Sequence, residues 1–246
     1  MSDNDKPSNA GELSPSGQPI LRHGEKTSWR AAEGESHTEE ISRHIERHLG
    51  SISGVFHEIV SDAVHIDVHI VAPSEDFPVI RMVTSGMSDL PMTTPPGPDI
   101  PRYLELMISL PGYWKTDQES FKDEAWYWPL RLLKFLARLP HQYATWLGFG
   151  HTIPNGDPPQ PYVPGVRFDG AVILPSVSVP EGFHQLFIDA DKTIQFLSVL
   201  PLYPEEMDLK LRQGIEAVLD RFGKRAVNDI VDLDRVNTAK KRLGFF

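Results

Sequence analysis

The sequence predicts an α+β fold: a single domain in which a mixed, largely antiparallel sheet is flanked by helices. Strand-like runs follow one another between a few helices instead of alternating with them one by one. The clearest helical pattern, WPLRLLKFLARLP at 128–140, carries a continuous leucine stripe. No internal repeat at a solenoid period is present, which argues against a repeat architecture.

Composition divides the chain into three parts. Residues 1–35 are rich in Ser, Gly, Asn, Pro and acidic residues and lack periodic apolar positions, so we interpret them as a disordered leader. The folded domain is expected over residues 36–223. Residues 224–246 form a mildly basic C-terminal extension, with six Lys and Arg residues against three Asp.

The first half of the domain is expected to contain one helix and four strands. The helix spans 36–50, because Ser36 and Glu39 have capping-box spacing and Gly50 follows the last apolar position. Strand patterns then cover 54–60, 64–71, 78–84 and 102–110. A segment dense in turn residues, 85–101, separates the last two strands.

The second half is expected to contain two strong helices and three strands. In the 128–140 helix, Pro129 fits a first turn, Pro140 stops the run, and the apolar stripe is Leu132, Leu133, Leu136 and Leu139. Strands are predicted within 165–176 and, as two strands, within 184–202. A single last helix over 203–223 should bury Met207, Leu211, Ile215, Val218 and Phe222.

Charge and composition exclude several classes of protein. The chain has no cysteine, so disulfides, thiolate nucleophiles and cysteine-based zinc sites are absent. Its net charge of −10 disfavours nucleic-acid partners. No stretch reaches the roughly 18 apolar residues of a membrane span, and the N-terminus does not resemble a secretory signal. We therefore expect a cytoplasmic protein with no membrane partner; the oligomeric state is not indicated.

The stretch VHIDVHIV, 64–71, alternates strictly between apolar and polar residues. Its strand geometry places His65, Asp67 and His69 on one face, which could be a metal site, a catalytic face or a solvated face. Zinc requires three or four fixed ligands, and only two imidazoles and one carboxylate are close together here. We therefore predict no metal and no cofactor.

Other motifs are incomplete. SGMSDL resembles a nucleophile elbow, but Leu90 stands where the second glycine belongs. GFGHTIP lacks the third glycine of a dinucleotide fingerprint, with Ile153 in its place. We therefore predict no catalytic residue and no enzymatic activity.

Six segments together resemble the bacterial branch of the Suppressor of fused domain family: VHIDVHIV, VTSGMSDLPM, RYLELMISLP, WPLRLLKFLARLPHQYATWLGFGHTIP, PGVRFDGAVILP and LSVLPLYPEEMDLKL. They follow the family's order over 64–211. The resemblance implies a domain like the N-terminal domain of Suppressor of fused, without known catalysis or cofactor. It also implies that His65 and Asp67 form a polar pair that orders the adjacent TSGMSD turn or lines a partner groove.

Bacterial relatives in this family are commonly found near polymorphic toxin systems and are proposed to act as immunity proteins. The resemblance therefore implies a non-enzymatic, cytoplasmic protein-binding domain that inhibits a toxin by stoichiometric occlusion, with a cationic toxin domain as the partner. The alternatives are a hydrolase using His65, Asp67 and His151, and a housekeeping adaptor. Glycines allow close backbone approach and Trp146 supplies an anchor, so the expected partner-binding residues are His65, Asp67, Ser85, Met87, Asp89, Trp146, Gly150 and His151.

Overall fold

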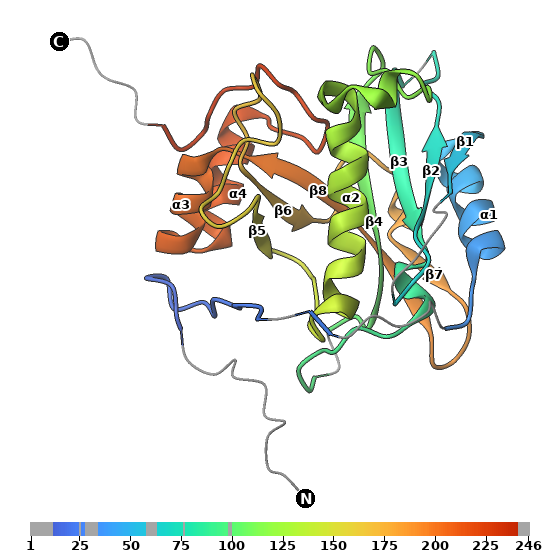
Figure 1. Ribbon diagram of the computed structural model, residues 1–246, viewed down its shortest axis with the longest axis horizontal. Helices are drawn as coiled ribbons and strands as arrows, with labels where there is room; N and C mark the ends of the chain where they lie inside the picture. Colours follow the sequence, from blue (N-terminus) through green and yellow to red (C-terminus); the bar gives the residue numbers. More distant parts are fainter. Residues whose placement is uncertain are drawn as a thin grey trace, which may run out of the picture.

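The computed structural model describes residues 12–24, 26–27, 34–57, 63–75, 77–97 and 100–240. Within them the chain forms one mixed eight-stranded sheet and four α-helices (Figure 1), which confirms the predicted single α+β domain. None of the helices in this described part is long and apolar enough to cross a membrane.

The sheet runs in the order β1-β2-β3-β4-β8-β6-β5, and β7 pairs with β8 beside this path. The strands are β1 Ile52–Phe56, β2 Asp67–Val71, β3 Val79–Ser85, β4 Tyr103–Pro111, β5 Thr152–Pro154, β6 Gly170–Leu174, β7 Gln185–Phe187 and β8 Thr193–Leu202. β4 and β8 pair in parallel, whereas the other strand pairs are antiparallel. The sheet is therefore two antiparallel halves joined by one parallel pair.

Helices cover both faces of the sheet. They are α1 Thr38–Leu49, α2 Glu124–Gln142, α3 Pro204–Gln213 and α4 Ile215–Arg225, with short 3₁₀ turns at η1 Met87–Asp89, η2 Ser120–Lys122 and η3 Glu181–Phe183. α2 packs on one face, where the predicted apolar set from Val64 to Ile70 meets its leucines. α1 covers β2, β3, β4 and β8 on the other face, and α3 with α4 covers β6 and the end of β8.

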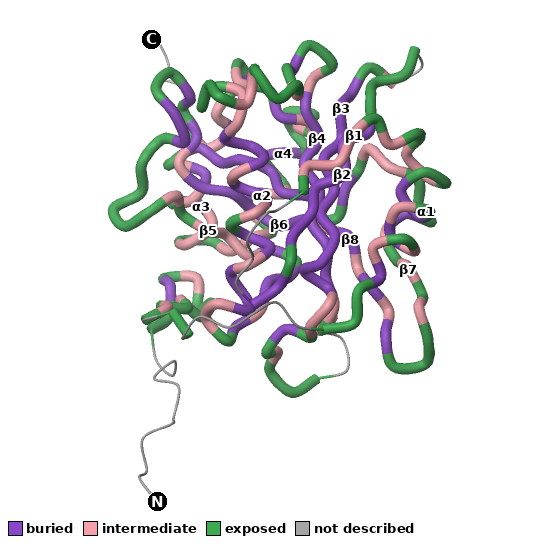
Figure 2. Tube along the Cα trace, turned by 45° about the vertical axis from the view of Figure 1, so that its right-hand side comes forward, coloured by how far each residue is buried: buried purple, intermediate pink, exposed green. Residues whose placement is uncertain are grey.

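The two layers of helices make the sheet the buried centre of the domain. Figure 2 shows the strands running through the buried interior, with exposed segments in the loops and on the outer sides of the helices. The polar face predicted for β2 is consequently not a solvated face. Asp67 and His69 are both buried there, and only His65, just before the strand, is exposed.

α2 is longer than predicted at both ends. It begins at Glu124, where the Asp123 carboxylate accepts a hydrogen bond from the Ala125 amide. Pro129 and Pro140 both lie inside the helix, so Pro129 does not occupy the first turn and Pro140 does not stop the run. Each proline removes one amide donor, and its ring crowds the carbonyl one turn earlier. The packing of the predicted leucine stripe, all of it buried, offsets this cost and holds the helix together.

The last predicted helix is two helices. Gly214 adopts φ 85° and ψ 175°, a conformation that side-chain-bearing residues rarely adopt, and separates α3 from α4. The break changes which side chains are buried: Leu209 is buried in place of Leu211, and Glu206 is completely buried. In α1 the predicted cap also differs, because the N-cap is His37 and no side chain caps the helix.

Both ends of the described chain pack more closely on the domain than the sequence predicts. Within the predicted leader, the Ser16 amide donates to the Leu211 carbonyl of α3. In the predicted C-terminal extension, the Val231 amide donates to the Ser109 carbonyl of β4, and Arg235 forms a buried ion pair. The amides of these end segments satisfy carbonyls that the helices and strands leave unpaired. The remainder of the predicted leader and residues 241–246 lie outside the described residues.

The leucine stripe of α2 gives a first test of the fold. Leu136→Ala should lower the free energy of unfolding by about 2–5 kcal/mol, because a fully buried side chain is lost and a cavity remains. Phe135→Ala, on the exposed side of the same helix, is the matched control and should change stability much less. Denaturant unfolding of both variants measures the difference, and equal effects would contradict the packing described here.

Candidate functional site

The segment after β3 folds back tightly on the approach to β2. Gly86 has φ 99°, and a Cβ atom there would lie 1.8 Å from the carbonyl oxygen of His65. Only glycine permits this contact, so the SGMSD segment is held against the HID segment. The structure thus brings the segment of His65 and Asp67 close to the segment of Ser85, Met87 and Asp89, which together hold five of the eight predicted partner-binding residues.

The turn at η1 is ordered by a residue that the sequence analysis missed, Glu105 of β4. Its completely buried carboxyl group accepts hydrogen bonds from the Thr84 hydroxyl at 2.6 Å, the Ser88 hydroxyl at 2.7 Å and the Ser88 amide at 2.9 Å. Burial raises the pKa of Glu105, and these hydrogen bonds oppose the rise. Glu105 thus orders the turn through its side chain, and the role that the resemblance implies for His65 and Asp67 stays a prediction.

The Asp67 carboxylate lies between two surface histidines. One carboxylate oxygen lies 3.0 Å from His57 Nδ1, and the other lies 3.1 Å from His65 Nε2. The Asp67 carboxylate is largely buried, whereas both imidazoles reach solvent. His65 therefore presents an oriented polar ring at the surface, and Asp67 fixes its position.

His69 and Ser85 form a pair closed off from solvent. His69 Nε2 lies 2.9 Å from Ser85 Oγ, and neither side chain is accessible. Burial lowers the pKa of His69. A nucleophile and its base would need access to substrate. We therefore interpret this pair as part of the interior that supports β2 and β3.

Asp89, at the end of η1, carries the most perturbed carboxylate of the turn. Burial, followed by the nearby charge of Glu105, raises its pKa to about 7, while Lys192 and the His37 amide oppose the rise. The backbone of Asp89 also contacts Gly34, where a Cβ atom would lie 2.4 Å from the Asp89 carbonyl oxygen. Asp89 thus links the turn to the segment that enters α1.

A hydrogen bond connects the turn to the end of α2. His141 Nε2 lies 2.8 Å from the Met87 carbonyl oxygen, and the Thr93 amide donates to the Thr145 carbonyl at 3.1 Å. Between these contacts lies an open hollow of about 460 Å³. It is lined by Thr27, Leu90, Pro91, Thr93, Pro140, His141 and Ala144.

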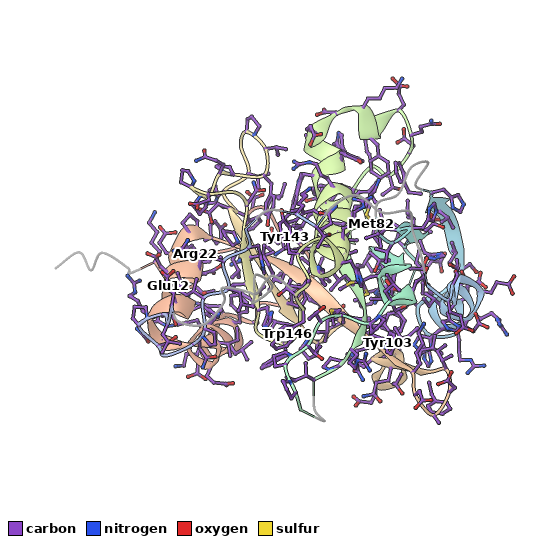
Figure 3. The ribbon with its side chains drawn as sticks, turned by 60° about the horizontal axis from the view of Figure 1, so that its bottom comes forward. Glu12, Arg22, Met82, Tyr103, Tyr143 and Trp146 are labelled. Atoms are coloured by element: carbon purple, nitrogen blue, oxygen red, sulfur yellow. The ribbon has the colours of Figure 1, made fainter. Side chains whose placement is uncertain are left out.

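The loop after α2 presents an aromatic pair. The Trp146 and His151 rings are 4.2 Å apart, and Gly148 lets the Trp146 ring approach the backbone, since a Cβ atom there would lie 2.8 Å from it. Gly150, with φ 76°, returns the chain to the sheet by donating to the Ile173 carbonyl. Burial, followed by the charge of Lys210, lowers the pKa of His151 to about 4, so this ring is neutral at pH 7. Figure 3 shows Trp146 and Tyr143 at this end of the domain.

The predicted site residues fall into three groups. His65, Asp67 and Asp89 gather around η1. Ser85 and Met87 are completely buried, so they support the turn from inside and do not reach a partner through their side chains. Trp146, Gly150 and His151 lie together between α2 and β5, on the other half of the sheet.

The hydrolase alternative required His151 to lie beside His65 and Asp67. β5, which follows His151, is five strand positions from β2, or roughly 24 Å at the usual spacing. The three residues therefore do not form one catalytic constellation. Among the described residues, no group of three or more His, Asp and Glu side chains is arranged to hold a metal ion.

Comparison with known proteins identifies a family. The model of the suppressor of fused protein family matches residues 62–236. A suppressor of fused homologue from Neisseria gonorrhoeae FA 1090 is 17% identical with a TM-score of 0.60, and the match covers 82% of this chain and 97% of that one. The comparison with curated protein sequences gave no match.

Two further solved structures share the fold. The Sufu–Fu complex structure matches at 14% identity and a TM-score of 0.58, covering 84% of this chain and 93% of that one. Drosophila Suppressor of Fused matches at 13% identity and a TM-score of 0.53, covering 87% of this chain but 53% of that one. This chain thus spans about half of the Drosophila protein. At these identities the structures establish a common fold.

Glu105→Gln tests the buried carboxyl group. Glutamine keeps one acceptor oxygen, but its amide nitrogen would face either the Thr84 hydroxyl or the Ser88 donors, so at least one hydrogen bond would be lost and the free energy of unfolding should fall by about 1–3 kcal/mol. Glu216→Gln, the same exchange at an exposed position of α4, is the matched control. If denaturant unfolding shows the same stability for both, Glu105 does not order the turn.

Asp89→Asn tests the raised pKa. Between about pH 4 and pH 7 the folded chain holds a proton at Asp89 that the unfolded chain has released, so this group lowers stability as pH rises. The asparagine variant should match the parent chain near pH 4. At pH 8 it should be more stable by roughly 1 kcal/mol, less than the full shift because solvent reaches the group. A stability difference that does not change with pH would contradict this assignment.

Proposed function

Because the chain belongs to the suppressor of fused family, we propose that it is a non-enzymatic protein-binding domain that acts by stoichiometric contact with a partner protein. One structure similar to it is that of a complex, Sufu with Fu. The partner would contact the end of the domain that carries η1, the C-terminal end of α2 and the loop at Trp146.

The distance between the two ends of the site is the main support for this proposal. Its two ends, at the exposed His65 and at the half-buried His151, are separated by roughly 24 Å, estimated from five strand spacings. A general acid or base must lie within about 3 Å of the reacting group, so this width does not suit one reaction centre. An interface of standard size buries about 800 Å² per partner and is about 30 Å across, which fits the patch.

The surface chemistry also suits a protein interface. Phe149, which is 52% exposed, lies near the half-buried Trp146, and the open hollow adds Leu90 and Pro91. Polar groups flank these apolar ones, with His65 and Asp89 at η1. An apolar anchor surrounded by polar groups is the usual arrangement of an interface hot spot.

The partner class follows from charge and from the family resemblance. With a net charge of −10, the chain would attract a cationic protein and associate with it faster at low salt. Together with the resemblance to bacterial immunity proteins, this supports the more specific proposal that the chain is a cytoplasmic inhibitor that occludes a toxin domain. Asp67, through His65, and Asp89 would supply polar specificity around the Trp146 anchor.

The decisive experiment is a titration with the toxin encoded by the neighbouring gene. Inhibition should be complete at one equivalent, and Trp146→Ala should weaken binding at least tenfold, as expected for an interface anchor. Phe149→Ala should act in the same direction, and it tests the same surface with an exposed side chain whose loss leaves the core intact.

Tyr113→Ala is the control, because Tyr113 is 66% exposed but follows β4 and lies away from this patch. It should leave binding unchanged, and circular dichroism should show that all three variants are folded. Complete inhibition of the toxin at far less than one equivalent of this chain would indicate catalytic turnover and would support an enzymatic function instead. The absence of a complex would favour the adaptor alternative and refute the immunity role.

A further inference from the structure

A second hollow, of about 660 Å³, lies at the end of the domain opposite η1. Three stretches line it: the end of β4 with Tyr113 just after it, the last residue of α4 with its C-cap, and most of residues 227–236. In Figure 1 these stretches meet at the upper edge of the domain. The hollow is therefore separate from the partner surface proposed above, which lies around η1 and the C-terminal end of α2.

Apolar side chains are open to solvent in this hollow. Tyr113 is exposed, and Val236 on the facing stretch is 62% exposed. Val227 and Ile230, which line the same hollow, are half-buried. Exposed apolar side chains that gather in one hollow mark a binding surface, whereas single ones scattered over a protein do not. The described part of the chain leaves this surface uncovered.

Two carboxylates of the lining have no counterion. Asp232 and Asp234 are both exposed, and neither forms an ion pair with any described residue. Of the two bases in the lining, Arg235 is already paired with the buried Glu206. The other, Arg225, is the last residue of α4, where the negative end of the helix dipole partly offsets its charge. An occupant of this hollow should therefore combine apolar side chains with positive charge.

Residues 241–246, which lie outside the described residues, have this chemistry. Their sequence is KRLGFF, so two bases precede three large apolar residues and no acidic residue is present. They also follow directly on the segment that lines the hollow. The same chain thus supplies both the hollow and a segment of matching charge and apolar character.

The described chain ends close enough for this segment to reach the hollow. Val236 lines the hollow, and Lys240 is four residues further on, at most about 14 Å away. The Asn237 side-chain oxygen accepts hydrogen bonds from the amides of Ala239 and Lys240, both at 3.1 Å, and this turn shortens the span. Six extended residues cover about 20 Å, which is more than the return path requires.

We propose that residues 241–246 bind in this hollow in cis, with their two bases facing Asp232 and Asp234 and their apolar side chains covering Tyr113 and Val236. Bound there, they would hold the C-terminal segment against the end of β4, where the Val231 amide already bonds to the strand. The inference requires no partner protein, so it goes beyond the proposed function and does not depend on it.

The absence of cysteine from the chain allows a test with one introduced thiol. Val236→Cys places it in the hollow of the full chain, and a second chain adds Phe245→Ser and Phe246→Ser to remove both aromatic rings. A neutral maleimide should label the thiol about tenfold more slowly when the phenylalanines are present, because a segment tethered at about millimolar local concentration closes a site that it binds with a dissociation constant of about 0.1 mM. Equal labelling rates in the two chains would refute the site.

Phe187→Cys supplies the control thiol, because Phe187 is 70% exposed at the other end of the sheet. β7 pairs with the beginning of β8, level with Tyr103 of β4, whereas the hollow lies at the Pro111 end of β4. The control thiol should be labelled at the same rate with and without the serine substitutions, and circular dichroism should show that every variant is folded. An equal change at both thiols would mean general loosening instead of local covering, and would also refute the site.

Lys241→Gln together with Arg242→Gln tests the charge pairing. Loss of nearby bases alone makes a thiol less acidic and slows its labelling, because the thiolate is the reactive form. Faster labelling at position 236 in this variant would therefore report loss of binding, and it is the expected result. An unchanged or slower rate would refute the pairing with Asp232 and Asp234. Protection that disappears on dilution would assign the bound segment to a second copy of the chain and refute binding in cis.

Discussion

The parallel pairing of β4 with β8 is the constraint on which the rest of the domain depends. It alone joins the antiparallel half β1 to β4 to the half formed by β8, β6 and β5. Parallel neighbours cannot be joined by a tight turn, so the chain must leave the sheet after β4 and return later. The segment that leaves the sheet after β4 contains α2 and the loop at Trp146. This connection therefore positions the half of the candidate site that includes Trp146.

The same pairing opens a gap that the C-terminal segment fills. β4 and β8 pair only as far as Met107 and Ser198, and beyond this point their facing edges have no strand partner. The Val231 amide bonds to the β4 edge, and the Arg235 guanidinium bonds to the β8 edge through the Pro201 carbonyl. Arg235 also forms a bidentate pair with buried Glu206 at 2.6 and 2.7 Å, so residues beyond the predicted domain boundary complete the core.

The sequence predicts those features whose cause is local. The alternating apolar residues of the β2 segment and the leucine stripe of α2 are buried as predicted, because each repeat of apolar residues lies within a single strand or helix. The alternation of apolar and polar residues does not show which elements cover the polar face of β2. It therefore does not predict that His69 is buried. Nothing local pairs Glu105 with its donors, although it is the one charged residue of a mostly apolar strand. Gly214 was missed because a helix tolerates one glycine at a cost of about 1 kcal/mol. The contacts of Ser16 and Thr27 with α3 and α2 have no sequence signature, because backbone amides make them.

The buried pair of Glu206 and Arg235 also couples the burial of α3 to that of the C-terminal segment. Burial alone would raise the pKa of Glu206, but the hydrogen bonds and charge of Arg235 hold it below its ordinary value, so the pair is ionised. An uncompensated charge costs several kcal/mol in the interior, and neither partner can be buried first. The burial of Glu206 in α3 therefore depends on a residue 29 positions later in the chain. Without the C-terminal segment, the gap between β4 and β8 would expose unpaired strand edges, so the ion pair that completes the core also protects edges that are prone to aggregation.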